Sequence, residues 1–256
     1  MAKSSSSQRL DFEAPIIELE KKIEELRTFA ESTEVDLSGQ IEKLVKKCDE
    51  KKRAIFNNLT PWQKIQLARH PQRPLTTDIV KAIVADFIEL HGDKAFRDDP
   101  AILCGLGRID EQRVLLVGHR KGKDTAEKVA CHFGSPHPEG YKKAMLKMKM
   151  ADKFGVPIVT FINTPGAYPG IGAEERGQAF VIARNLMDMA NLRVPVICVV
   201  IGEGGSGGAL GIGVGNRIMM MEHSYYSVIS PEGCAAILWK SAEYKETAAK
   251  ILKLTA

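Results

Sequence analysis

The 256-residue sequence predicts an α/β fold that is preceded by a hairpin of two amphipathic helices. Two segments of one kind occur 38 residues apart, at 156–166 and 194–204. Each contains a Val-Pro pair, an apolar strand and a glycine loop, and each follows a predicted helix. Because successive copies of one unit stack, we expect neighbouring strands whose glycine loops lie side by side in the ligand crevice of the sheet.

The composition is that of a chain with a full hydrophobic core and a weak charge bias. Apolar residues make up 44% of the sequence and the formal net charge is +4. The apolar runs are too short to span a membrane and the N-terminus lacks an apolar signal region, so we expect a cytoplasmic protein without a membrane partner. A nucleic-acid partner is not expected from this charge, whereas an acidic substrate is compatible with it.

The five cysteines are scattered and odd in number. This predicts reduced thiols, with no disulfide framework and no Cys-x-x-Cys metal site. The residues are Cys48, Cys104, Cys131, Cys198 and Cys234.

The chain divides into three predicted stretches. The Ser-rich residues 1–9 predict a disordered tail. Residues 10–58 predict the helical hairpin, a packing appendage whose charged surface lacks a cluster of reactive groups. Residues 59–256 predict the α/β domain. The apolar seam of the hairpin consists of Ile16, Leu19, Ile23, Leu26 and Ala30, followed by Leu37, Ile41, Leu44, Val45 and Cys48.

Elements of the α/β domain follow from helix starts, alternation and turn residues. Thr60-Pro61 begins a short helix, and the segment 77–90 predicts an amphipathic helix. Strands are predicted at 102–109 and 113–118 as a hairpin, and a helix at 141–154 leads into the strand of the first repeat. Two more strands at 218–221 and 225–229 precede one last helix.

The segment 201–215 reads Ile-Gly-Glu-Gly-Gly-Ser-Gly-Gly-Ala-Leu-Gly-Ile-Gly-Val-Gly and directly follows an apolar strand. A strand, a tight turn and a helix start leave unpaired backbone N–H groups that point in one direction. Such an end binds negative charge, either a phosphate or a carbonyl oxygen that becomes negative during a reaction.

Short motifs leave alternative functions open for this segment. Gly202, Gly204 and Gly207 match the Gly-x-Gly-x-x-Gly fingerprint of an NAD-binding protein, and Glu222 stands twenty residues after the first of them. The several glycines of the helix predicted next weaken that interpretation. A structural interpretation is that the glycines only allow helix and strand to approach closely.

A serine hydrolase is the other alternative. Gly204-Gly205-Ser206-Gly207-Gly208 matches the nucleophile elbow Gly-x-Ser-x-Gly, in the strand-turn-helix context that it requires. The candidate acid and base, Glu222 and His223, are sequence neighbours, which does not suit the separate positions of a catalytic triad. A P-loop is excluded because no lysine follows the last glycine.

Five longer motifs together resemble one family, the carboxyltransferase alpha subunits of bacterial acetyl-CoA carboxylase. The resemblance covers almost everything after about Leu10, and the motifs occur in the family's order. They are Leu-Ala-Arg-His-Pro-Gln-Arg-Pro at 67–74, Thr-Pro-Gly-Ala-Tyr-Pro-Gly at 164–170, Gly-Ala-Glu-Glu-Arg-Gly-Gln at 172–178, Gly-Glu-Gly-Gly-Ser-Gly-Gly-Ala-Leu at 202–210 and Ser-Pro-Glu-Gly-Cys at 230–234.

The resemblance implies a crotonase-like fold, a spiral of β-β-α turns. It implies transfer of a carboxyl group from carboxybiotin, held on a separate biotin carboxyl carrier protein, to acetyl-CoA, giving malonyl-CoA in the first committed step of fatty-acid biosynthesis. The implied partners are a beta subunit in an α2β2 heterotetramer, the carrier and the biotin carboxylase of the ATP-dependent holoenzyme. Zinc is expected on the beta subunit, and no metal is expected in this chain.

In this family the glycine segment implies an oxyanion hole. We assign the donors that stabilise the biotin ureido oxygen to the backbone amides of Gly207 and Gly208, with Gly204 and Gly205 shaping the turn. A substitution of Gly208 by valine is then expected to impair catalysis more than folding. In the first repeat, Gly166 and Ala167 are expected to form the pocket wall and Tyr168 to lie beside the biotin ring. The prolines of that loop alternatively serve only to make it rigid.

Other polar groups have less specific interpretations. The basic residues of 119–149 are expected to meet coenzyme A phosphates or acidic partners, or to form a solvated surface. His132 and His137 are expected in ordinary polar roles, and 174–176 as charges at a helix start. Two departures from the family stand out: Asn163 replaces its usual Asp, and the chain stops at Ala256, inside its predicted last helix, where the family continues for several dozen residues.

Overall fold

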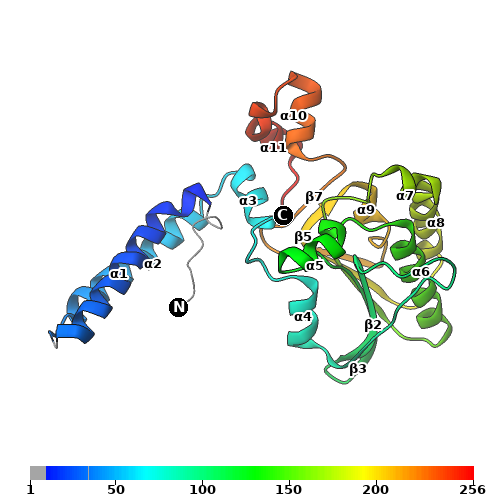
Figure 1. Ribbon diagram of the computed structural model, residues 1–256, viewed down its shortest axis with the longest axis horizontal. Helices are drawn as coiled ribbons and strands as arrows, with labels where there is room; N and C mark the ends of the chain where they lie inside the picture. Colours follow the sequence, from blue (N-terminus) through cyan, green and yellow to red (C-terminus); the bar gives the residue numbers. More distant parts are fainter. Residues whose placement is uncertain (1–9, 34) are drawn as a thin grey trace.

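A mixed β-sheet lies at the centre of the α/β domain in the computed structural model, which describes residues 10–33 and 35–256 (Figure 1). The predicted tail at 1–9 lies outside the described residues. Within the described part the strands follow the order β1-β2-β3-β4-β5-β6, and β7 also pairs with β5. The strands are β1 (Ala85–Glu89), β2 (Ile102–Ile109), β3 (Gln112–His119), β4 (Ile158–Thr164), β5 (Val196–Gly205), β6 (Arg217–Met220) and β7 (Tyr225–Ser227).

The sheet combines one antiparallel edge with a parallel centre. The predicted hairpin is confirmed, because β2 and β3 pair antiparallel from Ile102 with His119 to Ile109 with Gln112. From β3 onward β4, β5 and β6 run parallel, as repeated helix-and-strand units require. The carboxyl ends of β3, β4 and β5 therefore lie at one edge of the sheet, where open α/β sheets bind their ligands.

The internal repeat sets the register of the two central strands. Ile158 pairs with Val196 and Ile162 pairs with Val200, so the pairing offset equals the 38-residue repeat. After that point the register shifts, and Thr164 pairs with Gly204. The prediction of two neighbouring strands that end side by side is confirmed, and β5 bulges by two residues just before its end.

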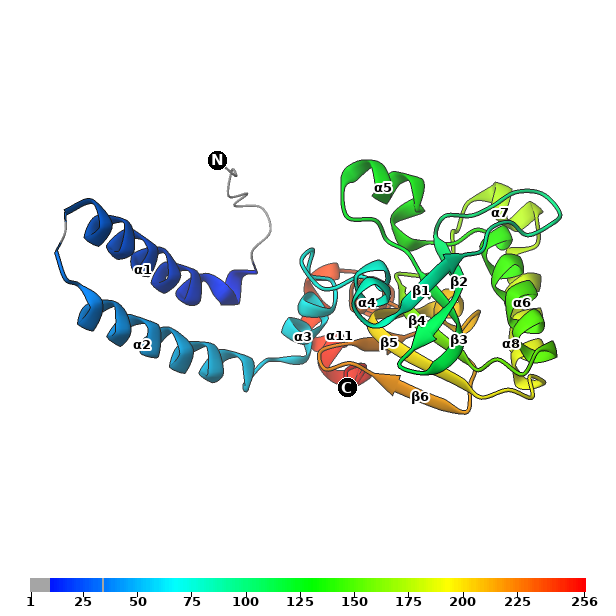
Figure 2. The ribbon, with the colours of Figure 1, turned by 90° about the horizontal axis from the view of Figure 1, so that it is seen from below.

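Helices cover both faces of the sheet (Figures 1 and 2). On one face α6 (Pro138–Lys153) and α8 (Gln178–Ala190) pack on side chains such as Leu115 and Val117 of β3. On the other face α4 (Thr76–Ile83) covers Val114 and Leu116 of the same strand. This alternation along β3 is the period-2 pattern of a strand buried on both faces.

One predicted element needs correction between residues 76 and 90. The segment predicted as one helix at 77–90 forms the shorter α4 and then the edge strand β1. The helix ends where Val84 takes an extended conformation, with φ −115° and ψ 119°. β1 then pairs antiparallel with β2, for example Ile88 with Leu106. Pairing with a strand distant in sequence decides this conformation, so the helical pattern alone was misleading.

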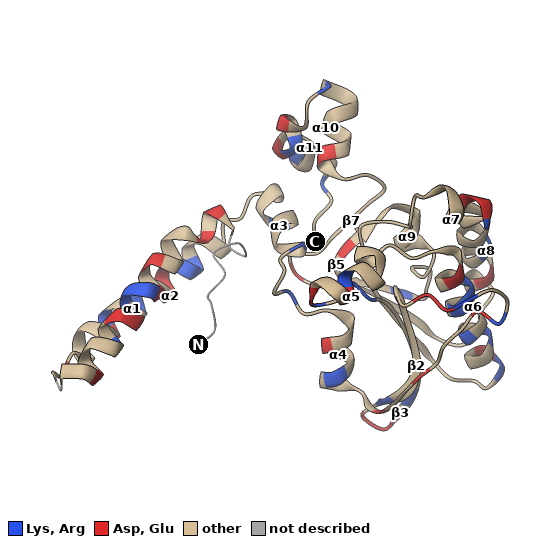
Figure 3. Cartoon of the chain, in the orientation of Figure 1, with Lys and Arg blue, Asp and Glu red and all other residues tan. Residues whose placement is uncertain are grey.

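The N-terminal hairpin forms as predicted. Its helices α1 (Ala14–Thr33) and α2 (Ser38–Phe56) follow a short 3-10 turn η2 (Asp11–Glu13) and bury Ile16, Ile23 and Cys48 between them. Figure 1 shows the hairpin extending away from the sheet, and Figure 3 shows charges of both signs along it. The domain boundary at 58 stays a prediction.

The C-terminal part contains more helix than predicted and lies beside α3 (Pro61–Ala68) (Figure 1). Thr60 caps α3, accepting from the Gln63 amide at 3.2 Å, as the helix-start signal predicted. The single predicted last helix is instead α10 (Pro231–Trp239), a 3-10 turn η4 (Ala242–Tyr244) and α11 (Lys245–Leu252). Residue 256 also lies beyond the last helix, because α11 ends at Leu252 and Thr255 bridges to Tyr225.

Short helices surround the carboxyl edge of the sheet. They are α5 (Thr125–Ala130), the 3-10 turn η3 (His132–Gly134), α7 (Ile171–Glu175) and α9 (Ser206–Leu210). All five cysteines are buried and free, as expected. Within the described ranges no helix has both the length and the apolar character needed to cross a membrane.

Candidate active site

The two glycine loops are in direct backbone contact at the carboxyl edge of the sheet. A Cβ atom added to Gly208 would lie 2.3 Å from the Ala167 nitrogen, and one added to Gly205 would lie 2.2 Å from the Pro165 oxygen. Side chains at these two positions would therefore push the loops apart. The interpretation that these glycines permit close approach is confirmed here, and the approach unites the two loops into one site.

The site has open space at two other glycines. The nearest atom to an added Cβ at Gly207 is 3.8 Å away, on Ile182, and at Gly166 it is 3.9 Å away, on Ser206. Gly166 also has φ +149°, a conformation that other residues rarely adopt. Space is therefore open beside both glycines, while the backbone N–H and C=O of Gly166 themselves hydrogen-bond to Thr164 Oγ1 at 3.0 and 2.9 Å.

Helix α9 starts directly at the end of β5, with Gly205 as its N-cap. The first N–H groups of a helix have no partner within it, so the amides of Gly207 and Gly208 have no acceptor inside α9. The helix has only five residues. Gly211, Gly213 and Gly215, which the sequence placed in a longer glycine-rich helix, lie beyond its end, and that expectation was wrong.

Asn163 fills the bulge between the two strands. Its Oδ1 accepts the Glu203 backbone N–H at 3.1 Å, on the part of β5 where the ladder pairing has shifted. A Cβ on Gly202 would lie 2.8 Å from the same oxygen. The interaction needs a side-chain oxygen and no negative charge, which explains how Asn stands where the family commonly has Asp.

A buried ion-pair network below the bulge was missed by sequence reasoning. Glu203 Oε1 accepts from Arg69 Nε at 2.8 Å and from the Tyr225 hydroxyl at 2.9 Å, while its Oε2 contacts Lys121 Nζ. Arg69 also pairs with Glu232 at 2.6 Å. These groups come from five segments of the chain. The motifs at 67–74, 202–210 and 230–234 contain Arg69, Glu203 and Glu232, but nothing in the sequence indicated that these residues pair.

Arg73, the second arginine of the motif at 67–74, hydrogen-bonds mainly to backbone carbonyl groups. Arg73 donates to the Ile201 oxygen at 2.6 Å, the Glu222 oxygen at 2.9 Å and Ser224 Oγ at 3.0 Å. Burial lowers the pKa of Arg73 from its ordinary value. The motif thus ties the segment after α3 to the end of β5.

Tyr168 lies in the first loop against histidine rings. Its ring stacks on His137 with centroids 4.2 Å apart, and His132 meets both rings edge-on. The Tyr168 amide donates to the Pro136 oxygen at 3.0 Å, and Gln178 Nε2 donates to that oxygen at 2.7 Å. The loop is therefore held by the segment before α6.

Arg176 does not act as a charge at a helix start, which corrects its prediction. It donates to both oxygens of Glu139, a fully buried carboxylate, at 2.7 and 3.2 Å. It also contacts His137 Nδ1 at 3.2 Å. Burial first, and then the neighbouring side chains of His132, Arg97 and Arg176, lower the pKa of His137 to about 4.

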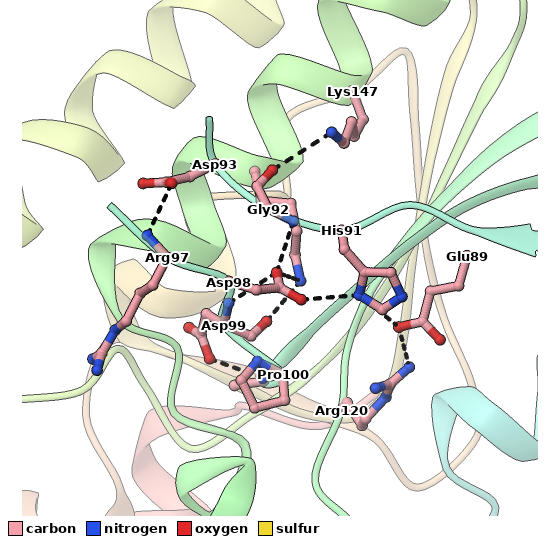
Figure 4. A network of polar contacts seen from close by, with 12 residues as sticks. Glu89, His91, Gly92, Asp93, Arg97, Asp98, Asp99, Pro100, Arg120 and Lys147 are labelled. Carbon is pink, nitrogen blue, oxygen red and sulfur yellow. Dashed lines mark hydrogen bonds and ion pairs between the residues drawn. The ribbon is translucent and has the colours of Figure 1, made fainter. Parts of the chain in front are cut away.

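Much of the basic stretch at 119–149 is not a solvated surface. Lys143 is 1% exposed and donates to Asp98 Oδ1 at 2.6 Å, and Arg120 donates to Glu89 at 2.7 Å. Figure 4 shows the segment 89–100 folded around Asp98, which also accepts from Gly92 and contacts His91. Burial opposes ionisation of Asp98, but these donors outweigh it and lower its pKa.

His119, the first residue of that stretch, lies buried under the two loops. Its Nδ1 accepts a hydrogen bond from the backbone N–H of Asn163 at 3.3 Å. Burial lowers its pKa to about 3, so the ring is neutral near pH 7. It supports β4 and does not contribute a positive charge to the site.

Neither alternative function has the required geometry. Ser206 has φ +53°, a strained strand-to-helix junction, but in the described chain no hydrogen bond joins its exposed hydroxyl to a histidine. An NAD-binding fingerprint needs its glycines in the turn after the strand, but β5 continues through Gly204 and Gly205. Glu222, the candidate ribose ligand, is 88% exposed. The described residues also lack a group of three or more His, Cys, Asp or Glu able to hold a metal ion.

Matched alanine substitutions at adjacent glycines test the packing. We expect Gly208→Ala to destabilise the protein by about 1–3 kcal/mol, because the new methyl group overlaps the Gly166-Ala167 backbone. Gly207→Ala has room, so its stability should be unchanged or rise by up to about 1 kcal/mol. Urea unfolding measures both. Equal stability of the two variants contradicts the contact. Because of this contact, a Gly208→Val substitution also disturbs packing and is not a clean test of catalysis.

The pH dependence of stability tests His119. Its folded pKa of about 3 lies below the unfolded value of 6.5, so the unfolded chain binds more protons between these values. The stability gained from a neutral His119 is complete above pH 6.5 and is lost as the pH falls toward 3. His119→Asn keeps an acceptor for Asn163 and should lose less stability between pH 7 and pH 4 than the parent. Equal slopes for the parent and His119→Asn refute the assignment.

Comparisons with known proteins agree with this geometry. The acetyl-coenzyme A carboxylase carboxyl transferase subunit alpha of Syntrophotalea carbinolica is 60% identical over 247 residues, 96% of this chain and 78% of that protein. The protein of the same name from Halalkalibacterium halodurans is 56% identical over 250 residues, 98% of this chain and 77% of that protein.

Solved structures show the same fold at low identity. Transcarboxylase 12S superposes with a TM-score of 0.59 at 19% identity, over 70% of this chain and 35% of that one. The beta subunit of P. aeruginosa geranyl-CoA carboxylase gives 0.56 at 21% identity, over 75% and 38%. These likenesses confirm the crotonase-like α/β fold. The family model described as acetyl co-enzyme A carboxylase carboxyltransferase-like matches residues 9–256, and the chain belongs to this family.

Proposed function

We propose that this chain is the alpha side of a carboxyltransferase that moves a carboxyl group between biotin on a carrier protein and acetyl-CoA, giving malonyl-CoA for fatty-acid biosynthesis. The observation that carries the proposal is the backbone contact between Gly208 and the Gly166-Ala167 loop. It brings the start of α9 and the first glycine loop together at the carboxyl edge of the sheet. Family membership and the names of relatives support the reaction.

The residues present fit a flat ureido ring. Space is open beside Gly166 and Gly207, and Tyr168 lies in the same loop with its ring held by His137. When bound, biotin supplies the ureido nitrogen that carries the carboxyl group. In our proposal the amides of Gly207 and Gly208 donate to the ureido oxygen, Gly204 and Gly205 set the turn, and Gly166 and Ala167 form the wall.

This arrangement works without a side-chain base. Backbone donors that are already oriented stabilise developing negative charge without reorganisation, and one such donor is typically worth about 3–4 kcal/mol of barrier. Below the loops, in the described part of the chain, His119 is neutral and Lys121 is paired with Glu203, so neither serves as a free catalytic acid or base. Proton transfer would then be supplied by the ureido nitrogen of bound biotin.

The remaining components belong to partners. We propose a beta subunit that carries zinc and most coenzyme A contacts in an α2β2 heterotetramer, with a biotin carboxyl carrier protein and a biotin carboxylase completing a cytoplasmic, ATP-dependent enzyme. The relatives' designation as an alpha subunit supports a beta partner. The internal pairing of the basic stretch also leaves this chain with few free cations for coenzyme A phosphates in that region.

A reconstitution tests the division of labour. We expect the purified chain alone to form no malonyl-CoA from acetyl-CoA and a carboxylated biotin donor, because the coenzyme A site lies largely on the partner. Adding a carboxyltransferase beta subunit should produce turnover, measured with radiolabelled carboxyl groups. Transfer by this chain alone refutes the proposal.

A substitution at Gly207 tests the amide assignment. Gly207→Val should lower carboxyl transfer by about two orders of magnitude, the effect of losing about one donor, because a branched side chain crowds the start of α9. Ser206→Ala is the control and should keep most activity, since the hydroxyl is exposed and makes no hydrogen bond to a histidine within the described chain. Turnover is measured beside the yield of the complex by gel filtration. Full activity of Gly207→Val places the donors elsewhere.

A further inference from the structure

The glycine segment after Glu203 has no anchoring side chains of its own. Four of residues 204–208 are glycines, and Ser206 is exposed. Glycine loses more conformational freedom on folding than any other residue, so such a segment needs neighbours to hold it. Glu203 is the last residue before the segment with a buried side chain. Whatever holds Glu203 therefore limits where the amides of α9 can lie.

Glu203 is held through both its backbone and its carboxylate. Its N–H donates to Asn163 Oδ1 at 3.1 Å, which ties it to the end of β4. Its carboxylate joins Arg69, Lys121 and Tyr225. Its side chain is 8% exposed. These contacts reach the end of β3, the segment after α3 and strand β7, so the bulge is fixed from three sides.

The positive and negative charges in the network around Glu203 are equal in number. Lys121 and Arg69 provide two positive charges, and Glu203 and Glu232 provide two negative charges. Burial by itself raises the pKa of Glu203, but Lys121 and Arg69 outweigh it, and the pKa lies below its ordinary value. Buried ion pairs often add little net stability, because desolvation offsets their attraction, yet they can specify one geometry.

We infer that Glu203 is a positioning residue for carboxyl transfer: its carboxylate, held by Lys121 and Arg69, fixes the end of β5 so that the amides of Gly207 and Gly208 face the first glycine loop. This inference rests on the proposed function of those amides. Glu203 touches no reacting atom. Its effect passes through the backbone, and a displacement of about 1 Å at such a site costs up to about 100-fold in rate.

The test compares charge-removing variants within the complex with the beta subunit. The assay follows the reverse reaction, transfer of the carboxyl group from malonyl-CoA to free biotin. The carboxyl group leaves the malonyl carbon and joins the ureido nitrogen, and the proton of that biotin N–H passes to the acetyl group. Glu203→Gln keeps the shape and loses the charge. We expect kcat to fall about tenfold or more, while KM for malonyl-CoA and the yield of complex change less than twofold.

Four further variants control this result. Lys121→Met should lower kcat as Glu203→Gln does, and the double variant should lose no more than either single one, because both remove one interaction. Glu203→Asp retains the charge and should recover part of kcat. Arg108→Met removes an exposed ion pair with Asp86, and its kcat should match the parent.

Two outcomes overturn the inference. In the first, Glu203→Gln keeps the parental kcat but has a lower melting temperature. In the second, its kcat falls only in parallel with the yield of complex. Either outcome shows that Glu203 contributes to stability alone. The proposed function is judged separately by Gly207→Val. Full activity there rejects the amide assignment, whereas full activity in Glu203→Gln rejects the positioning role and leaves the amides in place.

Discussion

Contact between the ends of β4 and β5 is the constraint on which the site depends. Two parallel strands normally diverge into separate loops, but here Gly205 and Gly208 remove every side chain that would keep the loops apart. The backbone of 164–167 can then lie against the first turn of α9. A site made of backbone groups requires this contact.

The contact is maintained by polar groups buried beneath it. Asn163 restores a hydrogen bond that the β5 bulge removes from the ladder, and Thr164 Oγ1 donates to the Gly134 oxygen at 2.7 Å. His119 remains neutral because it is buried, so it accepts from Asn163 without adding charge. The bulge therefore has few unpaired backbone groups, as buried polar groups require.

Several charged side chains of the α/β domain pair inside the molecule. Lys143, Arg176 and Lys121 each pair with a buried or half-buried carboxylate, and each pair joins segments far apart in the sequence. A net charge of +4 gives no sign of this, because paired charges cancel in the sum. Exposed lysines and acids alternate instead on the N-terminal hairpin, as Figure 3 shows.

The sequence by itself determined the repeat, the parallel central strands, the hairpin β2–β3 and the identity of the two glycine loops. These features depend on local pattern and on a repeat whose period equals the pairing offset of β4 and β5. Tertiary structure alone decided that 85–89 is a strand, that β5 bulges at Glu203, and that Arg69, Lys121 and Tyr225 meet there. Those outcomes depend on partners at least 16 residues away, and no local propensity encodes which distant strand or charge will be adjacent.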